Sequence, residues 1–219
     1  FLFFCVILFK MPRSSKPRQV SGEQKEQLEA YHKLLFKWQK AINLISPKTL
    51  QDSWSRHFLD SAQIYKFIPE SAKTYADLGC GGGFPGLVIA ILKPELQTTL
   101  VESDERKGQF MRTVIREAGI SNAKVVTERI EHYVEGTETT PDLVSARALA
   151  SLDKLCKFVL PWAQENPEMT CIFMKGENAL SEIDEAKKLY VFDVETAPSL
   201  TDSRASILVI KNLFSCKTA

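Results

Sequence analysis

The sequence predicts a doubly wound α/β fold with a seven-stranded, mostly parallel sheet and an N-terminal helical extension. Strand-like and helix-like segments alternate from about residue 74 onward, which is the pattern of a parallel sheet with helical crossovers. A glycine-rich loop joins the first strand to the helix after it. The last two strand-like segments, 191–197 and 204–212, have no helix between them, so we expect them to close the sheet as an antiparallel pair.

The 219 residues divide into a leader at 1–20, the helical extension at 21–68 and the α/β domain at 69–219. Residues 1–9 are apolar, but this stretch is far shorter than the ~20 residues of a membrane helix. Its flanking residues do not match those of a signal peptide. We therefore expect a disordered or non-native leader, with Met11 as the natural start and a weak membrane anchor as the alternative.

Charge is distributed unevenly along the chain. The net charge is only +1, but residues 11–57 contain nine Lys or Arg against four Asp or Glu. A basic segment of this kind favours contact with a phosphate backbone, and an ordinary solvated helix face is the alternative. The five cysteines form no CxxC pair, which predicts reduced thiols, no metal site and a cytoplasmic protein.

The extension is expected to contain two helices. Ser21 can cap the first, and Pro47 begins the second. Within the second helix, Arg56 and Asp60 are four residues apart and are expected to pair. His57 and Asp60 share a face and are candidates for lining a site, with an ordinary packed imidazole as the alternative for His57.

The glycine-rich loop lies in the segment YADLGCGGGFPG at 75–86. Asp77, Gly79, Gly81 and Gly83 form the pattern D-x-G-x-G-x-G. Glycines allow the backbone to approach a ligand closely and to adopt positive φ. A carboxylate at the strand end would repel a pyrophosphate and attract the amino end of a sulfonium cofactor. We therefore expect these four residues to bind S-adenosylmethionine.

Glu102 is a second indication of S-adenosylmethionine, because it lies at the end of a strand within the run TTLVES at 98–103. It lies 23 residues after Gly79, a reach that suits hydrogen bonds to ribose hydroxyls from the end of the next strand. Gly81, Gly83 and Gly86 also satisfy G-x-G-x-x-G, so an NAD site and a purely structural glycine turn are the alternatives.

Further elements continue the alternation of strand and helix. We expect a helix at 104–119 ended by Gly119, strands at 123–128 and 141–151, a helix at 152–163, a strand at 169–176 and a helix at 177–189. The glycine loop, Glu102, and the loops after Thr127 and at Ala146 and Arg147 then fall on one edge of the sheet, where the ligand should bind.

Motifs spread over residues 26–211 resemble one known family. They are NLIS, RHFLDS, ADLGCGGGFPGLVIAI, TLVESDERKGQFMR, ERIE, SARALASL and FMKG. In combination they resemble the bacterial glucose-inhibited division protein B family, also called RsmG, whose members are 16S ribosomal RNA guanine-N7 methyltransferases. Members commonly read SRAFA where this chain reads SARALA, and the arginine is retained as Arg147.

This resemblance implies a class I, Rossmann-like, S-adenosylmethionine-dependent methyltransferase. Its substrate would be one guanine of 16S rRNA, within the small ribosomal subunit or its assembly intermediate. Gly79 and Phe84 would contact the cofactor, Ile130 and Glu131 would border the adenine, and Arg147 would complete the site. We expect a monomer that does not associate with membranes.

Transfer of a methyl group to guanine N7 needs no general base, because N7 carries an in-plane lone pair and no proton. Catalysis would then depend on positioning and electrostatics. Arg147 is the main candidate for orienting guanine or the cofactor carboxylate, with a structural salt bridge, such as one to Asp142, as the alternative. Lys175 is a further candidate, with a surface lysine as the alternative, and His57 and Asp60 could line the pocket.

Two other functions compete with this hypothesis. An NAD-dependent oxidoreductase is disfavoured by the position of Asp77 and by the lack of a Tyr-x-x-x-Lys motif. A non-catalytic module that binds S-adenosylmethionine is disfavoured because Asp77, Glu102 and Arg147 are all present.

Overall fold

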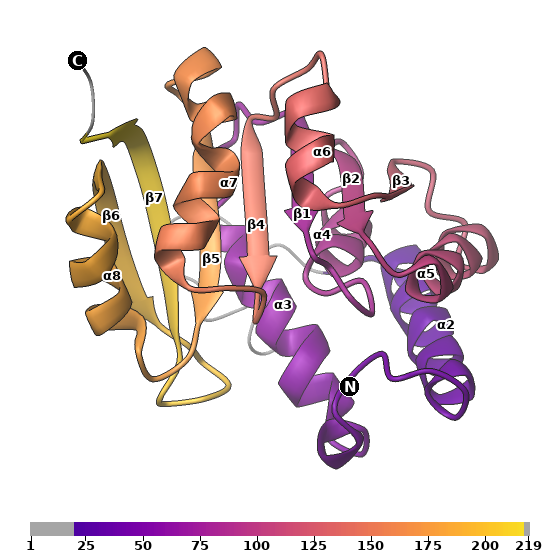
Figure 1. The fold of residues 1–219 in the computed structure, drawn as a ribbon. Helices are drawn as coiled ribbons and strands as arrows, with labels where there is room; N and C mark the ends of the chain where they lie inside the picture. Colours follow the sequence, from indigo (N-terminus) through magenta and orange to yellow (C-terminus); the bar gives the residue numbers. More distant parts are fainter. Residues whose placement is uncertain (1–19, 217–219) are drawn as a thin grey trace.

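The computed structural model describes residues 20–216, which form a sheet covered by helices on both faces (Figure 1). The sheet has seven strands in the order β3-β2-β1-β4-β5-β7-β6. The strands are β1 (Thr74–Leu78), β2 (Gln97–Glu102), β3 (Ala123–Thr127), β4 (Leu143–Arg147), β5 (Thr170–Lys175), β6 (Tyr190–Pro198) and β7 (Ser206–Ser215). Strands β1 to β5 pair in parallel, and β7 runs antiparallel to both β5 and β6. The predicted doubly wound sheet and its antiparallel closing pair are confirmed.

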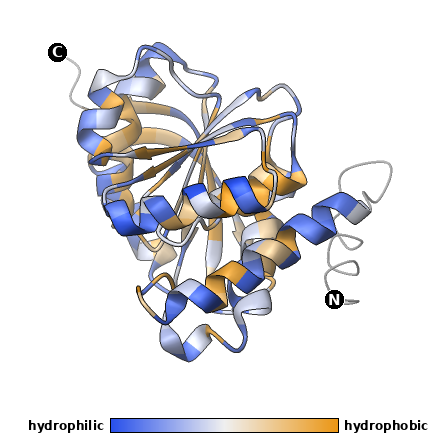
Figure 2. Cartoon of the chain, turned by 90° about the vertical axis from the view of Figure 1, so that its right-hand side faces the viewer, coloured by the Kyte–Doolittle hydropathy of each residue, from blue (hydrophilic) through white to orange (hydrophobic). Residues whose placement is uncertain are grey.

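Helices bury the sheet on both sides. One face packs against α6, α7 and α8, and the other against α2, α4 and α5. Their bounds are α2 (Gly22–Gln39), α4 (Gly86–Leu92), α5 (Glu105–Glu117), α6 (Ile130–Gly136), α7 (Leu152–Glu165) and α8 (Ala179–Lys187). All of β5 and most of β1 and β4 are buried, as expected for parallel strands enclosed by helices. In Figure 2 the central strands are mostly hydrophobic, and the helices around them carry both hydrophobic and hydrophilic residues.

The extension begins as predicted and then departs from the prediction. Ser21 caps α2 through a capping box with Gln24. The expected second helix is confirmed over residues 53–67, where η2 (Trp54–Leu59), α3 (Asp60–Ala62) and η3 (Gln63–Phe67) follow one another without a break. Pro47 does not begin it, because η1 (Pro47–Thr49) is a separate short turn before it. The π-type turn of η2 is wider than an α-helical turn. In this segment Trp54 and Phe58 pack against His32 of α2, with ring centroids 4.8 and 5.5 Å apart.

An aromatic cluster joins the extension to the sheet domain. Tyr31 of α2 is fully buried and stacks on Phe84 with centroids 5.1 Å apart. It also contacts Phe58 at 4.9 Å and Phe110 at 6.2 Å. Its hydroxyl donates to the Gly82 carbonyl at 2.5 Å. Each such aromatic pair stabilises the fold by about 0.5–1.5 kcal/mol beyond its buried area, so the extension and the glycine loop pack as one unit.

Two predicted boundaries can be compared with the structure. Helix α5 is followed by Gly119 in a left-handed conformation with φ +65°, which confirms its role as a stop signal. The predicted leader at 1–20 lies outside the described residues, except for Val20. Within residues 20–216, no helix combines the length and the apolar character needed to cross a membrane.

Candidate functional site

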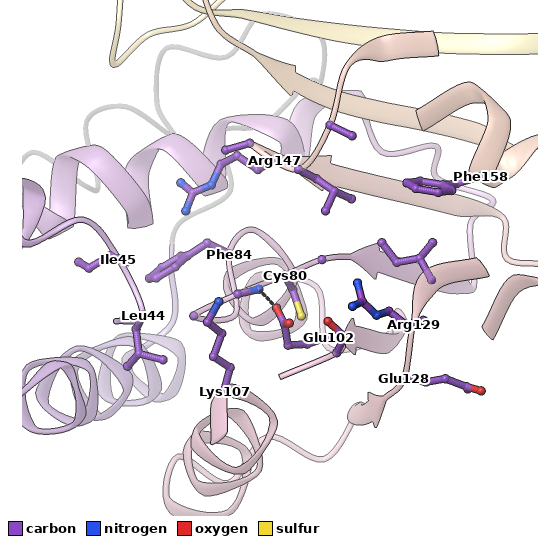
Figure 3. Close-up of a pocket in the computed structure, with 18 of the residues that line it drawn as sticks. Leu44, Ile45, Cys80, Phe84, Glu102, Lys107, Glu128, Arg129, Arg147 and Phe158 are labelled. Carbon is purple, nitrogen blue, oxygen red and sulfur yellow. Dashed lines mark hydrogen bonds between the residues drawn. The ribbon is translucent and has the colours of Figure 1, made fainter. Parts of the chain in front are cut away.

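A cavity of about 570 Å³ lies at the carboxyl-terminal edge of the parallel strands (Figure 3). Open α/β sheets bind ligands at this edge, and the volume lies within the range of ~300–1,000 Å³ that is usual for small-molecule sites. The loop after β1, the ends of β2 and β3, the start of α6 and the loop after β4 form its wall. The predicted site residues in this wall are His57, Gly79, Gly81, Phe84, Glu102, Ile130, Glu131 and Arg147.

The loop after β1 owes its shape to its glycines. Gly79, Gly81 and Gly83 have φ of +64°, +56° and +91°, a conformation that side chains disfavour. A Cβ at Gly79 would lie 2.5 Å from Leu149 Cδ1, so the loop also needs glycine there for space. Gly83 lies outside the cavity wall, where a Cβ would meet Leu87 Cδ1 at 2.5 Å. Gly79 and Gly81 therefore border the cavity, and Gly83 supports the turn into α4.

Glu102 is held rigidly at the end of β2. Its Oε2 accepts the Gly81 N–H at 2.9 Å, and its Oε1 accepts the Asp104 N–H at 2.9 Å (Figure 3). The residue is only 8 % exposed, and it faces the cavity. Each carboxylate oxygen has a second lone pair, so Glu102 can accept hydrogen bonds from a ligand without releasing the loop.

Asp77 lies behind the glycine loop, outside the cavity wall. Its Oδ2 accepts the Gly86 N–H at 2.7 Å, and its Oδ1 accepts the Ser145 hydroxyl at 2.6 Å. Burial raises the pKa of Asp77 from 3.8 to about 7, although these hydrogen bonds lower it. A Cβ at Gly86 would lie 2.7 Å from Asp77 Oδ2, so the carboxyl group and the start of α4 require each other. In this structure Asp77 anchors the loop and does not border the ligand space.

The cavity wall contains both predicted residues and residues that the sequence pattern did not reveal. Ile130 and Glu131 of α6 line the cavity as predicted. Lys107, Arg129 and Phe158 line it as well (Figure 3). Two of these had a local signal, because Lys107 lies in the first turn of α5, five residues after the end of β2, and Arg129 directly precedes Ile130. Phe158 had none, since it falls inside the ordinary apolar pattern of α7.

Arg147 connects the end of β4 to the extension. Its Nη1 donates to Asp60 Oδ2 at 3.2 Å, and its Nη2 donates to His57 Nδ1 at 3.1 Å. The guanidinium carbon also lies 5.2 Å from the centroid of the Phe84 ring. His57 and Asp60, the two candidates from the extension, thus both contact Arg147. Arg147 forms a salt bridge, as the alternative reading expected, but its partner is Asp60 and not the suggested Asp142.

Two side chains have partners other than those considered from the sequence. Asp142 accepts the Lys73 and Thr74 backbone N–H groups at 2.8 and 3.0 Å, at the opposite end of the strands from Arg147. Arg56 pairs with Asp202 at 3.2 Å, so the predicted i, i+4 pair with Asp60 is wrong. Asp60 is instead engaged by Arg147, a long-range contact that helix spacing does not encode.

His57 is neutral and has one consistent tautomer. Thr49 Oγ1 donates to the Ser46 carbonyl at 2.9 Å, which leaves it to accept the His57 Nε2 proton at 2.8 Å. Nδ1 is then free to accept from Arg147. Burial, together with the positive charges of Arg147 and Arg56, lowers the pKa of His57 to about 3. His57 therefore orients the guanidinium and carries no charge at neutral pH.

Lys175 lies beside a second cavity of about 300 Å³, which opens next to the first. It is 9 % exposed, pairs with Glu182 at 2.6 Å and donates to the Ala150 carbonyl at 2.6 Å. The alternative of a surface lysine is therefore wrong. Asp60 also lines this smaller cavity and not the larger one.

The larger cavity has the groups that S-adenosylmethionine requires. Glu102 provides acceptors for ribose hydroxyls, and the glycine loop allows close backbone approach. Ile130 offers an apolar contact for a purine, and Glu131 beside it offers an acceptor for an exocyclic amine. Among residues 20–216, no group of three or more His, Cys, Asp or Glu side chains could hold a metal ion.

Comparisons with known proteins agree with this geometry. The family model GidB, described as rRNA small subunit methyltransferase G, matches residues 24–208. The "Ribosomal RNA small subunit methyltransferase G" of Parvibaculum lavamentivorans is 48 % identical over 89 % of this chain and 85 % of its own length. Its counterpart from Cereibacter sphaeroides is 43 % identical over 89 % of this chain and 93 % of its own length.

Solved structures support the fold. A mutant of MtNAS in complex with S-adenosylmethionine superposes with a TM-score of 0.56 at 16 % identity, covering 86 % of this chain and 72 % of that chain. A fibrillarin/Nop5p complex gives a TM-score of 0.55 at 14 % identity, covering 73 % of this chain and 82 % of that chain. At such identities the likeness concerns the fold alone, whereas the family match and the two relatives cover most of the sequence. The chain therefore belongs to the GidB family, rRNA small subunit methyltransferase G.

Proposed function

We propose that this protein is an S-adenosylmethionine-dependent methyltransferase that modifies N7 of one guanine in 16S rRNA of the small ribosomal subunit. The observation that carries this proposal is the cradle of Glu102 and the glycine loop, which faces Arg147 across one cavity. Membership of the GidB family supports the same reaction class and the same RNA.

The larger cavity holds the cofactor. Glu102 binds the ribose hydroxyls, and Gly79 and Gly81 lie along the ligand, where side chains would obstruct it. Ile130 and Glu131 border the adenine. Asp77 contributes from behind by holding the loop in position through the Gly86 N–H.

The methyl transfer needs no general acid or general base from the protein. When bound, S-adenosylmethionine supplies a methyl group on a positively charged sulfur, so the guanine N7 lone pair forms the new C–N bond as the C–S bond breaks and the positive charge moves to the base. The protein therefore has to position the base and tolerate a cation in either place. Arg147, oriented by His57 and Asp60, is the group that positions the guanine, and no proton has to be removed.

The RNA substrate is the small-subunit rRNA in an assembled or assembling particle, because N7 of a stacked base in an A-form groove is poorly accessible. Four exposed lysines would contact the phosphate backbone: Lys33 and Lys37 of α2, Lys40 directly after α2 and Lys48 of η1. The protein would act as a monomer in the cytoplasm, where small subunits are assembled.

Two alternatives fit the site less well. For an NAD-dependent oxidoreductase, the cavity wall would need a group that transfers or accepts a proton beside the nicotinamide, and His57 has its pKa lowered to about 3. For a non-catalytic module, a half-buried arginine oriented by two partners at the cavity edge would have no function in catalysis to explain it. Binding of S-adenosylmethionine measured against NAD separates the first alternative from our proposal.

The decisive test is to map 7-methylguanine in 16S rRNA from cells with and without this gene. We expect one modified guanine to lose its methyl group in the deletion strain and to regain it with the wild-type gene. Complementation with Arg147→Ala should fail, while the purified variant still binds S-adenosylmethionine. An unchanged methylation pattern in the deletion strain would refute the proposal.

A further inference from the structure

The smaller cavity, of about 300 Å³, adjoins the larger one through a shared wall. His57, Arg147 and Ala148 line both cavities. The turn between β6 and β7 contributes Thr201 and Ala205 to the wall of the smaller cavity. If the larger cavity holds the methyl donor, this adjoining space is where an acceptor could lie directly beside the methyl group.

The polar groups of the smaller cavity include one fixed donor and one fixed acceptor. Arg147 presents a guanidinium, which only donates hydrogen bonds. Asp60 presents a carboxylate whose Oδ1 is occupied by Gln63 Nε2 at 2.8 Å and Thr201 Oγ1 at 2.5 Å. Within the described residues Arg147, at 3.2 Å, is the one partner of Oδ2, which leaves a lone pair of that oxygen for a further donor.

The order of these groups matches the edge of a guanine ring. Going around the base, N7 is followed by O6 and then by N1–H. The site has a matching order from the larger cavity to the smaller one. Arg147 lines both cavities and so lies between them, whereas Asp60 lines only the smaller one. A guanine with O6 toward Arg147 and N1–H toward Asp60 therefore turns N7 toward the larger cavity.

We propose that the smaller cavity receives the target guanine, unstacked from the rRNA, with Arg147 reading O6 and Asp60 reading N1–H. This inference rests on the methyltransferase function proposed above. Adenine would meet both groups with the wrong polarity, because its N6 amine donates toward a guanidinium and its unprotonated N1 faces a carboxylate. Sites that hydrogen-bond a substrate reject an analogue whose polar groups do not match. The pair Arg147–Asp60 thus selects guanine.

Filling the cavity tests the location. Ala205 lines the smaller cavity and not the larger one, so Ala205→Phe should obstruct the base and leave the cofactor space open. We expect kcat/KM for small subunits from the deletion strain to fall at least about 100-fold, as misplacement of a reacting group does. The dissociation constant of S-adenosylmethionine should stay within about twofold of the wild-type value. Ser203→Phe, at an exposed position of the same turn, is the matched control and should retain wild-type activity.

A second substitution tests the recognition. Asp60→Asn keeps the size of the side chain and removes its charge, and we expect kcat/KM to fall about 10-fold or more with binding of S-adenosylmethionine retained. Asp52→Asn, an exposed carboxylate of the same extension, is the control and should have no effect. Ala205→Leu replaces Ala205→Phe if thermal unfolding shows that the larger side chain prevents folding.

Wild-type activity in both folded Ala205 variants would overturn the assignment of the cavity. So would an equal loss of activity in Ser203→Phe, because that result would indicate a surface contact with RNA, and so would wild-type activity in Asp60→Asn. If the wild-type protein itself transfers no methyl group to these subunits, the proposed function is refuted, and this outcome is distinct from all the others.

Discussion

Replacing Asp77 by asparagine is expected to remove a large pH dependence from the folding stability. Asp77 is fully buried, and burial raises the pKa of its carboxyl group from 3.8 in an ordinary environment to about 7. The native state therefore binds this proton more tightly than the unfolded chain does. The resulting stabilisation is fully present below about pH 4 and is lost as the pH rises through 7.

The magnitude follows from the two pKa values. They differ by about 3 pH units, and each unit corresponds to about 1.4 kcal/mol, so the ionised form destabilises the native state by about 4 kcal/mol above pH 7. Asparagine avoids this cost and keeps the hydrogen bonds. Its oxygen can accept the Gly86 N–H, and its amide can donate to Ser145 Oγ, whose own proton then turns to the Tyr75 hydroxyl 2.6 Å away.

The assay is urea unfolding of the wild-type protein and Asp77→Asn between pH 4 and pH 8, without cofactor. We expect similar free energies of unfolding at pH 4 and a variant that is more stable by up to about 4 kcal/mol at pH 8. Asp52→Asn, at an exposed position, is the control and should differ from the wild type by a constant amount. A pH-independent difference between Asp77→Asn and the wild type would refute the assignment of a perturbed carboxyl group behind the loop.

Three further predictions concern the cavity wall. Glu102→Gln would turn an amide N–H toward a backbone N–H, so the dissociation constant of S-adenosylmethionine measured by calorimetry should rise at least about tenfold, and an unchanged constant would contradict the role of the carboxylate. Gly79→Ala should lower the free energy of unfolding by about 1–3 kcal/mol, because φ is +64° and the new Cβ would meet Leu149. Adding Leu149→Ala in the same chain removes the steric contact but not the strain in φ, so it should restore only part of that loss. Because the pKa of His57 is lowered to about 3, kcat should show no inflection near pH 6.5, and a step there that vanishes in His57→Gln would disprove its neutral state.

Much of the fold is encoded in local patterns. Ser21 and Gly119 mark helix ends through their own backbone chemistry, and the structure confirms both. The alternation of strands and helices predicts a parallel sheet, and the carboxyl ends of parallel strands then lie on one edge. Glu102 and Arg147 were for this reason expected near each other, although 45 positions separate them in the sequence.

The parts that sequence patterns did not predict depend on long-range contacts. Nothing in the spacing of Arg56 and Asp60 indicates that each would find a partner elsewhere, at Asp202 and Arg147. Asp77 could be placed at a strand end, but the side to which its carboxyl group points depends on α4 packing over it. The helix at 53–67 was expected from its apolar spacing, but the packing of Trp54 on His32 of α2 joins positions 22 apart and has no local signal.

The partition between the two cavities has a consequence for how the protein matures. His57 and Arg147, which form it together, are 90 positions apart in the chain. During synthesis, His57 lacks Arg147 as a partner until β4 has left the ribosome and has entered the sheet. The orientation of the guanidinium therefore depends on the extension and on β4 together, and neither His57 nor Arg147 would keep its geometry if it were grafted alone onto another scaffold.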